Sequence, residues 1–450
     1  MRLLSLLGIF ILTACASVGD SAQGQSGQKW VVSWAASIQG PYPIGNPSAM
    51  PDMSRVFPTP ANGARDQSFR LIVRPTLWGR ETRIRMTNAW GAKPVTFDGV
   101  YVGLQNSGAE VTAGTNRAIT FGGKNRVTVA AGQSVWSDAV ALPFVRDAAS
   151  HELAGRKLAV SFHVVGESGP MTWHAKALQS SYVTWPGAGA KGHEENEGAF
   201  PFATAAWFFL DALDMRATGN DSDAYAVVAF GDSITDGTAS TINGDDRWPD
   251  VLDRRLRAAY GNRVAVVNAG IGGNQVVGPA VYPPPKPLPP FPGGPSALSR
   301  LERDVLALSG VRAVIWLEGT NDFSRNGNAT FEAVANGMRE GVARIRARIP
   351  GVRVIGATVV SALGATSPAH GFKEQDDKRR QLNEFIRTAG VFDGVADFDK
   401  VVTDPQTGAM RAEFVPDNTV GGPGDKLHPN RLGYMAMGNV IDLKLLAPWR

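Results

Sequence analysis

Two short polar segments in the C-terminal half contain residue types that together perform nucleophilic chemistry. Residues 230–237 (FGDSITDG) include Ser233, and residues 424–430 (GDKLHPN) include Asp425 and His428. A serine hydroxyl is a poor nucleophile until a neighbouring base accepts its proton. An aspartate three residues before a histidine can orient the imidazole and stabilise its protonated form. We therefore take Ser233, His428 and Asp425 as candidates for nucleophile, general base and orienting carboxylate.

Each segment also has a purely structural interpretation. Ser233 can cap the N-terminus of a helix, and Asp425 can be a capping residue beside a surface histidine. The residues around Ser233 lack the Gly-x-Ser-x-Gly pattern, so the nucleophile elbow of α/β-hydrolases does not apply. Pro429 suits the first turn of the helix expected after it. Alone, neither segment decides between a catalytic and a structural role.

Two further segments offer hydrogen-bond donors after apolar stretches. Residues 268–274 (NAGIGGN) contain Gly272 and Gly273, and Asn321 follows the next apolar stretch. A glycine lets its N–H approach a substrate oxygen closely, and an asparagine side chain adds a directed donor. With the N–H of Ser233 they would form a three-donor oxyanion hole, for which we prefer Gly273 to its neighbour. Ordinary turn glycines and an Asx turn are the structural alternative.

The elements that must position these residues alternate between apolar strands and amphipathic helices. The expected strands span residues 225–230, 264–267, 311–317, 352–360 and 395–398. The expected helices span residues 248–260, 297–308, 331–349, 374–388 and 431–446. Strands that are apolar throughout are buried on both faces, as in a parallel sheet. Five β-α units predict a doubly wound α/β domain with its active site at the carboxyl ends of the strands.

The N-terminal half has a different pattern. Short runs with period-two alternation, separated by turn residues, predict an all-β sandwich or jelly-roll domain over residues 30–217. The polar residues 216–223 are the candidate boundary to a second domain over residues 224–450, and two domains suit a chain of 450 residues. The proline-dense residues 278–295 predict a surface loop, either a wall of a substrate channel or a rigid decoration.

The four segments that contain the candidate residues resemble, in the same order, the four sequence blocks of the SGNH (GDSL-type) hydrolase family. The resemblance covers about residues 224–447. It implies a flavodoxin-like SGNH fold with a five-stranded parallel sheet, and a serine ester hydrolase that needs no metal and no cofactor. The roles it implies are nucleophile for Ser233, general base for His428, orienting carboxylate for Asp425, and oxyanion donors for Ser233, Gly273 and Asn321.

A finer resemblance extends into the N-terminal half. Residues 32–37, 83–88, 294–298 and 317–319 resemble a xylan-esterase-like branch of the family, in which a β-rich module precedes the hydrolase domain. This implies an acylated carbohydrate as the ester substrate. Three tryptophans of the N-terminal half either stack on sugars or belong to the core, and the core is the preferred interpretation: Trp30, Trp34 and Trp173.

The first residues predict export. Residues 1–14 combine a basic start with an apolar stretch that is shorter than the ~20 residues needed to span a bilayer. Residues 12–15 (LTAC) resemble a bacterial lipobox, which implies cleavage before Cys15 and its lipidation; an ordinary signal peptide is the alternative. Residues 15–29 are expected to be a flexible tether. The expected location is the bacterial cell envelope, and Ala16 favours the outer membrane.

These observations predict an exported serine esterase that deacetylates a carbohydrate. The alternatives are a lipase, lysophospholipase or arylesterase, an acyltransferase acting on an envelope sugar, and a non-catalytic carbohydrate-binding lipoprotein. The net charge of +4 comes without basic residues interleaved with aromatics, so no nucleic-acid partner is expected, and no metal-ligand spacing is present. The remaining histidines are expected to be structural or surface residues: His151, His163, His193 and His370.

Overall fold

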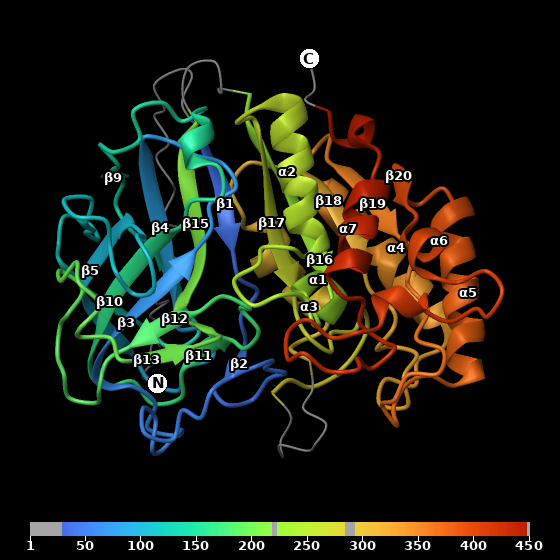
Figure 1. The fold of residues 1–450 in the computed structure, drawn as a ribbon, viewed down its shortest axis with the longest axis horizontal. Coiled ribbons are helices and arrows are strands. Elements are labelled where there is room, and N and C mark those ends of the chain that lie inside the picture. The colour runs from blue at the N-terminus through green and yellow to red at the C-terminus, as the bar shows by residue number, and fades with distance from the viewer. Residues whose placement is uncertain (1–28, 218–222, 284–292, 448–450) are drawn as a thin grey trace, which may run out of the picture.

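The chain folds into an antiparallel β-rich part and a parallel α/β part that lie side by side (Figure 1). A computed structural model describes residues 29–217, 223–283 and 293–447. The predicted signal peptide, Cys15 and the predicted tether up to residue 28 lie outside the described residues, as do residues 284–292 of the proline-dense segment. No helix within the described ranges is long and apolar enough to cross a membrane.

Five strands form a parallel sheet in the spatial order β17-β16-β18-β19-β20. Their bounds are β16 Tyr225–Gly231, β17 Val264–Gly270, β18 Val311–Leu317, β19 Arg353–Ala357 and β20 Gly394–Ala396. Every residue of the central strand β16 is buried, as its continuous apolar sequence predicts for a strand covered on both faces. The expectation of a doubly wound parallel sheet is therefore confirmed.

Helices cover both faces of this sheet (Figure 1). Their bounds are α1 Ser233–Asp236, α2 Trp248–Tyr260, α3 Ala297–Leu301, α4 Phe331–Arg348, α5 Lys373–Thr388, α6 Phe398–Val402 and α7 Arg431–Val440. Neighbouring residues of β16 belong to different cores. Val227 packs in the core that contains Trp248 of α2 and Tyr434 of α7. Val228 packs in the core that contains Met338 of α4.

Strand β19 ends at Ala357 instead of residue 360. At three other elements a cap or turn ends the element earlier than the sequence pattern predicts. Strand β20 stops at Ala396 because the Asp397 side chain accepts a hydrogen bond from the Lys400 N–H and starts α6 there. Helix α3 gives way after Leu301 to a π-helical turn over Glu302–Leu306. Helix α7 ends at Val440, and a separate 3₁₀ turn follows at Leu443–Leu446. In each case a local cap or turn interrupts an apolar pattern that continues in the sequence.

The N-terminal part consists of antiparallel sheets, as predicted. One sheet contains β1 Lys29–Ala35, β15 Leu210–Ala217, β4 Glu81–Thr87, β8 Ser134–Trp136 and β9 Val140–Ala141. A second contains β13 Phe202–Thr204, β12 Ser181–Val183, β3 Arg65–Val73, β10 Leu158–Glu167, β5 Val95–Leu104, β6 Arg117–Ala118 and β7 Arg126–Val129. A short third sheet contains β14 Trp207–Phe208, β11 Thr172–His174 and β2 Gln39–Pro41.

The three singled-out tryptophans serve this part as structural residues. Trp34 and Trp173 are buried, and the Trp173 indole donates to the Ile44 carbonyl at 2.9 Å. Trp30 packs against the guanidinium groups of Arg83 and Arg216. The core interpretation therefore holds for Trp34 and Trp173, whereas Trp30 is only partly buried.

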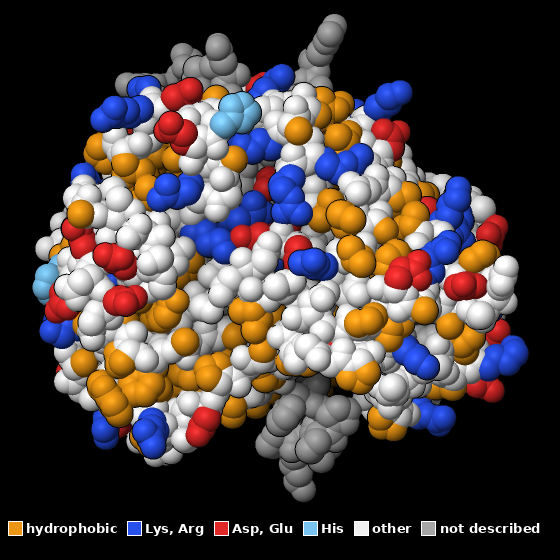
Figure 2. Space-filling model, in the orientation of Figure 1, with side chains coloured by type: hydrophobic (Ala, Val, Ile, Leu, Met, Phe, Trp, Pro, Cys, Tyr) orange, Lys and Arg blue, Asp and Glu red, His pale blue; other side chains and the backbone are white. Residues whose placement is uncertain are grey.

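The N-terminal part packs against the edge of the parallel sheet that β17 forms. Strand β17 is the edge strand, and its Val266 N–H donates to the Thr76 hydroxyl at 3.2 Å. Ion pairs also cross the boundary: Arg74 contacts Asp250 and Asp253, each at 2.8 Å. Charged side chains of both signs gather where the two halves meet (Figure 2). Because an unpaired sheet edge is a liability, this cover gives the N-terminal part a structural role.

Candidate active site

Three neighbouring strands bring the predicted residues to one edge of the parallel sheet. Strand β16 is followed by Ser233, β17 by Gly273, and β18 by Asn321. His428 comes from the loop before α7. The carboxyl ends of parallel strands lie at the same edge, so residues far apart in the sequence meet there.

A continuous hydrogen-bonded chain joins the three polar residues. The Ser233 Oγ lies 2.8 Å from the His428 Nε2, and the His428 Nδ1 lies 2.6 Å from the Asp425 Oδ2. A carboxylate only accepts, so the proton of the neutral ring resides on Nδ1. The free Nε2 lone pair then accepts the Ser233 hydroxyl proton. This is the tautomer that a general base requires.

Hydrogen bonds to Asp425 and a glycine hold the conformation of the loop that carries His428. The Asp425 Oδ1 accepts the N–H groups of Leu427 and His428, each at 2.9 Å. A side chain at Gly424 would place its Cβ 1.7 Å from the Val415 carbonyl oxygen, so only glycine fits. Burial opposes the charge on Asp425, but the hydrogen bonds from His428 and Leu427 outweigh it and lower its pKa. The carboxylate therefore stays ionised at neutral pH.

Ser233 begins the single helical turn α1. Asp232 caps this turn, and its carboxylate accepts the Ile234 N–H at 2.9 Å. Burial raises the pKa of Asp232 to about 8, although the Ile234 hydrogen bond opposes the shift. The Ser233 N–H donates to no other described residue and remains free for a ligand. The structural interpretation thus applies to the neighbouring aspartate, since Asp232 and not Ser233 is the cap.

The two adjacent glycines differ in what their N–H groups do. The Gly272 N–H donates to the Asp236 Oδ2 at 2.9 Å and is already occupied. Gly273 has a positive φ of 83°, and among the described residues its N–H has no acceptor. Asn321 uses one hydrogen of Nδ2 on the Asn274 carbonyl at 2.9 Å, which leaves the other free. The free donors are therefore those of Ser233, Gly273 and Asn321.

The sequence comparison agrees with this geometry. Residues 229–436 match the family described as GDSL-like Lipase/Acylhydrolase. The C-terminal domain belongs to this family. It is a carboxylic ester hydrolase, as the resemblance implied. No curated protein was found to match the chain.

Several solved structures are similar to about half of the chain. A carbohydrate acetylesterase from Sinorhizobium meliloti is 17% identical, covering 50% of this chain and 100% of its own, with a TM-score of 0.38. A lipase/acylhydrolase from Enterococcus faecalis is 24% identical, covering 50% and 99%, with a TM-score of 0.36. An aryl esterase from M. smegmatis is 19% identical, covering 50% and 100%, with a TM-score of 0.38.

A buried arginine that the sequence analysis did not single out lies behind the site of this GDSL-like domain. Arg300 of α3 is completely buried, and its guanidinium donates to the Gly231 carbonyl at 2.8 Å and to the Asn274 Oδ1 at 2.8 Å. It also pairs with Glu318 at 3.2 Å and donates to the Ser37 hydroxyl at 3.2 Å. One side chain thereby links the ends of β16, β17 and β18 to the N-terminal part.

His370 lies closer to the hydrolase site than predicted. Its Nδ1 accepts a hydrogen bond from the Gln375 side chain at 2.8 Å, so its proton resides on Nε2. Burial, with a smaller contribution from the neighbouring His428, lowers the pKa of His370 to about 4. The sequence predicted a structural or surface role for His370 and did not reveal its position near His428. It was missed because it lies on a loop remote in sequence from every motif.

One assignment needs correction. Pro429 does not open the last helix, because Asn430 caps α7 and the helix begins at Arg431. His163 is buried, and its ring nitrogens lie 2.7 Å from the Asp98 carboxylate and 2.9 Å from the Asp66 carboxylate, which agrees with a structural role. No cluster of metal-ligating side chains occurs in the part of the chain that the structure describes.

Proposed function

We propose that the protein is an exported serine esterase that hydrolyses carboxylic esters through an acyl-enzyme on Ser233. The observation that carries the proposal is the hydrogen-bonded chain from the Ser233 Oγ through His428 to Asp425, with distances of 2.8 and 2.6 Å. A nucleophile, a base within reach and a group that orients the base are the parts needed for acyl transfer.

The geometry defines the order of steps. The Ser233 Oγ attacks the ester carbonyl carbon while the His428 Nε2 takes the hydroxyl proton, and Asp425 stabilises the imidazolium. The carbonyl oxygen becomes an oxyanion that accepts the free N–H groups of Ser233, Gly273 and Asn321. The intermediate collapses when the imidazolium protonates the departing alcohol oxygen. Water, deprotonated by His428, then attacks the acyl-enzyme and releases the acid.

The substrate we propose is a carbohydrate that carries a short acyl group. The nucleophile and one oxyanion donor are nearly buried: Ser233 is 5% and Asn321 8% exposed. Little room around these two residues would favour acetate over a long acyl chain. The finer resemblance to a xylan-esterase-like branch supports a sugar as the alcohol, and the lipobox-like residues 12–15 support export and lipid attachment at Cys15.

An acyl-chain series tests the function and the substrate size together. The protein without residues 1–15 is expected to cleave p-nitrophenyl acetate with a kcat/KM roughly ten- to hundredfold above that for the octanoate. Mass spectrometry of protein that is quenched during turnover and then digested should show one acetyl group on the peptide that contains Ser233. A preference for octanoate would favour a lipid ester, and acetate moved to an added sugar instead of water would favour an acyltransferase.

Replacing Asn321 by alanine tests the oxyanion donors. The variant removes one of three donors, and a reduction in kcat of roughly 10²- to 10³-fold is expected with little change in KM. Steady-state kinetics on p-nitrophenyl acetate measure it. Asn326→Ala is the matched control, since Asn326 is exposed in the same loop. Equal activity of both variants would remove Asn321 from the proposed site.

A further inference from the structure

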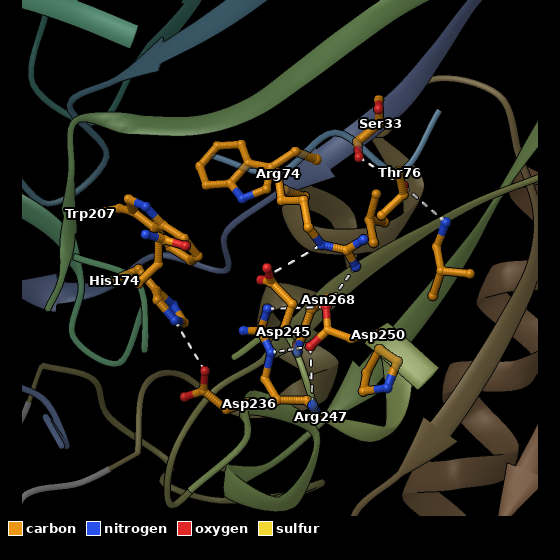
Figure 3. Close-up of a pocket in the computed structure, with 16 residues that line it drawn as sticks. Ser33, Arg74, Thr76, His174, Trp207, Asp236, Asp245, Arg247, Asp250 and Asn268 are labelled. Atoms are coloured by element: carbon orange, nitrogen blue, oxygen red, sulfur yellow. Dashed lines mark hydrogen bonds and ion pairs between the residues drawn. The ribbon is translucent and has the colours of Figure 1, made fainter. Parts of the chain in front are cut away.

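Two side chains of the N-terminal part reach the site of the hydrolase domain. His174, at the end of β11, is 3% exposed, and Lys176, two residues later, is 1% exposed. His174 lies next to the Trp207 ring and points at Asp236 of the GDSL-like domain (Figure 3). Neither basic side chain has a role in the chemistry described above.

The ring of His174 is surrounded by acceptors. Its Nδ1 lies 2.7 Å from the Ser37 carbonyl oxygen. Its Nε2 lies 3.1 Å from the Lys176 carbonyl oxygen and 3.1 Å from the Asp236 Oδ1. Carbonyl and carboxylate oxygens only accept, so both ring nitrogens must carry a proton to satisfy this arrangement. His174 is therefore an imidazolium that forms a buried ion pair with Asp236.

The Asp236 carboxylate and two backbone carbonyls favour the cationic form of the ring. Burial lowers the pKa of His174, but the Asp236 carboxylate and the hydrogen bonds to Ser37 and Lys176 outweigh it, so the pKa is raised. Two basic groups near the ring act against its charge. Lys176 donates to the Thr238 hydroxyl at 2.5 Å, and burial lowers the pKa of Lys176. Arg247 lines the same cavity as His174 and Asp236.

Asp236 connects the histidine to the oxyanion loop. It is the last residue of the turn that begins with Ser233, and its Oδ2 accepts the Gly272 N–H at 2.9 Å. A Cβ on Gly270 would lie 2.3 Å from the Asp236 N, so the end of β17 touches the same turn. One carboxylate thus holds the nucleophile's turn and the residue before Gly273 at a common position.

The N-terminal part also packs on the other side of this loop. A Cβ on Gly272 would lie 3.0 Å from the Lys176 Nζ and 3.3 Å from the Asn46 Cβ. Gly272 is therefore enclosed by the N-terminal part on one side and bound by Asp236 on the other. The bond to Asp236 and the packing against Lys176 hold Gly272 in place, and the peptide that carries the Gly273 N–H starts from this residue.

We propose that the N-terminal part completes the active site of the hydrolase: His174 is a positioning residue that acts through Asp236 and Gly272 to aim the Gly273 N–H at the substrate oxygen. The inference rests on the proposed function, in which Gly273 is an oxyanion donor. Donors that are fixed before the reaction stabilise the oxyanion without reorganisation, so loss of the fixation lowers kcat and leaves KM nearly unchanged.

His174→Gln tests the proposal in the full chain. The glutamine amide can replace one of the hydrogen bonds that the ring donates, but it carries no charge. We expect kcat for p-nitrophenyl acetate to fall roughly ten- to hundredfold, less than for complete removal of a donor. The inhibition constant of an aryl trifluoromethyl ketone, which forms a tetrahedral adduct with a serine, should rise by the same factor. This constant does not depend on the fraction of folded enzyme, so misfolding alone cannot change it.

His163→Gln is the matched control. His163 is also a buried histidine held between two oxygen acceptors, but both belong to the N-terminal part, Asp98 and Asp66. Its replacement should leave kcat and the inhibition constant within about twofold of wild type. Equal effects of the two glutamine variants, or an unchanged inhibition constant in His174→Gln, would overturn the proposal.

Two substitutions of Asp236 provide an independent test if His174→Gln fails to fold. Asp236→Ala removes the acceptor for Gly272 and should reproduce the loss of kcat. Asp236→Asn keeps an oxygen for the Gly272 N–H and offers an amide donor to a neutral His174, so it should recover most of that loss. Ser233→Ala separates the two proposals: an active Ser233→Ala variant refutes the proposed function, whereas an inactive one beside a fully active Asp236→Ala refutes only the role of His174.

Discussion

Replacement of Ser233 by alanine is expected to reduce kcat/KM for p-nitrophenyl acetate by roughly 10⁴- to 10⁶-fold. The variant leaves His428 and the oxyanion donors in place but removes the only atom that can form the acyl-enzyme. The loss should appear in kcat, because alanine does not obstruct substrate binding. Steady-state kinetics, together with the absence of an acetylated peptide in mass spectrometry, measure the effect.

The fold should tolerate this substitution. The hydrogen bond that the Ser233 Oγ makes within the described structure is the one to the His428 Nε2, so its removal costs at most about 1 kcal/mol. Ser240→Ala is the matched control, because Ser240 is a buried serine seven residues later whose hydroxyl has no protein partner among the described residues. We expect it to retain wild-type activity. A Ser233→Ala variant as active as Ser240→Ala would exclude acyl transfer through this residue.

Replacement of Arg300 by methionine is expected to lower the free energy of unfolding by about 3–5 kcal/mol. Methionine fills much of the volume but leaves the Glu318 carboxylate, the Gly231 carbonyl and the Asn274 amide without their shared donor. A buried carboxylate that loses its cation is strongly destabilising, because nothing replaces the lost solvation. The midpoint of urea unfolding, followed by tryptophan fluorescence, measures the change; Trp316, which donates to Glu318, lies next to the altered site.

Arg303→Met supplies the comparison. Arg303 also pairs with Asp304 and donates to the Ile38 carbonyl at 2.9 Å, but its side chain is 22% exposed. Asp304 keeps its ion pair with Arg300 at 3.0 Å in this variant, so a loss of at most about 1.5 kcal/mol is expected. If both variants unfold at the same urea concentration, the buried network of Arg300 stabilises the domain no more than the contacts of Arg303 do.

The predictable part of the site follows from short segments at strand ends. The strand expected at 311–317 is found with the same bounds, and the strands expected at 225–230 and 264–267 begin where predicted and extend to Gly231 and Gly270. Uniformly apolar strands can be recognised in the sequence because burial on both faces excludes polar residues. The polar residues that follow each strand are then brought to one edge by the topology alone.

The choice between Gly272 and Gly273 was open in the sequence for a physical reason. Both residues have the same side chain and lie on the same turn, so only the partners of their N–H groups distinguish them. The Asp236 carboxylate occupies the N–H of Gly272, and that contact depends on the packing of α1 against the loop after β17. The place of His370 could not be predicted for a similar reason, since its partner Gln375 and its proximity to His428 arise from a loop conformation.

The sequence by itself determined the parallel sheet, the antiparallel N-terminal part and the order of the polar motifs, because each depends on local periodicity or on a short run of residues. Only the tertiary structure decided that Arg300 joins three strand ends and that His174 of one part contacts Asp236 of the other. These contacts join residues separated by 18 to 69 positions, and a histidine or an arginine has no local signal that identifies its partner. The pairs form only in the folded protein, because burial there excludes water and each charged group has only the neighbouring acceptor as a partner.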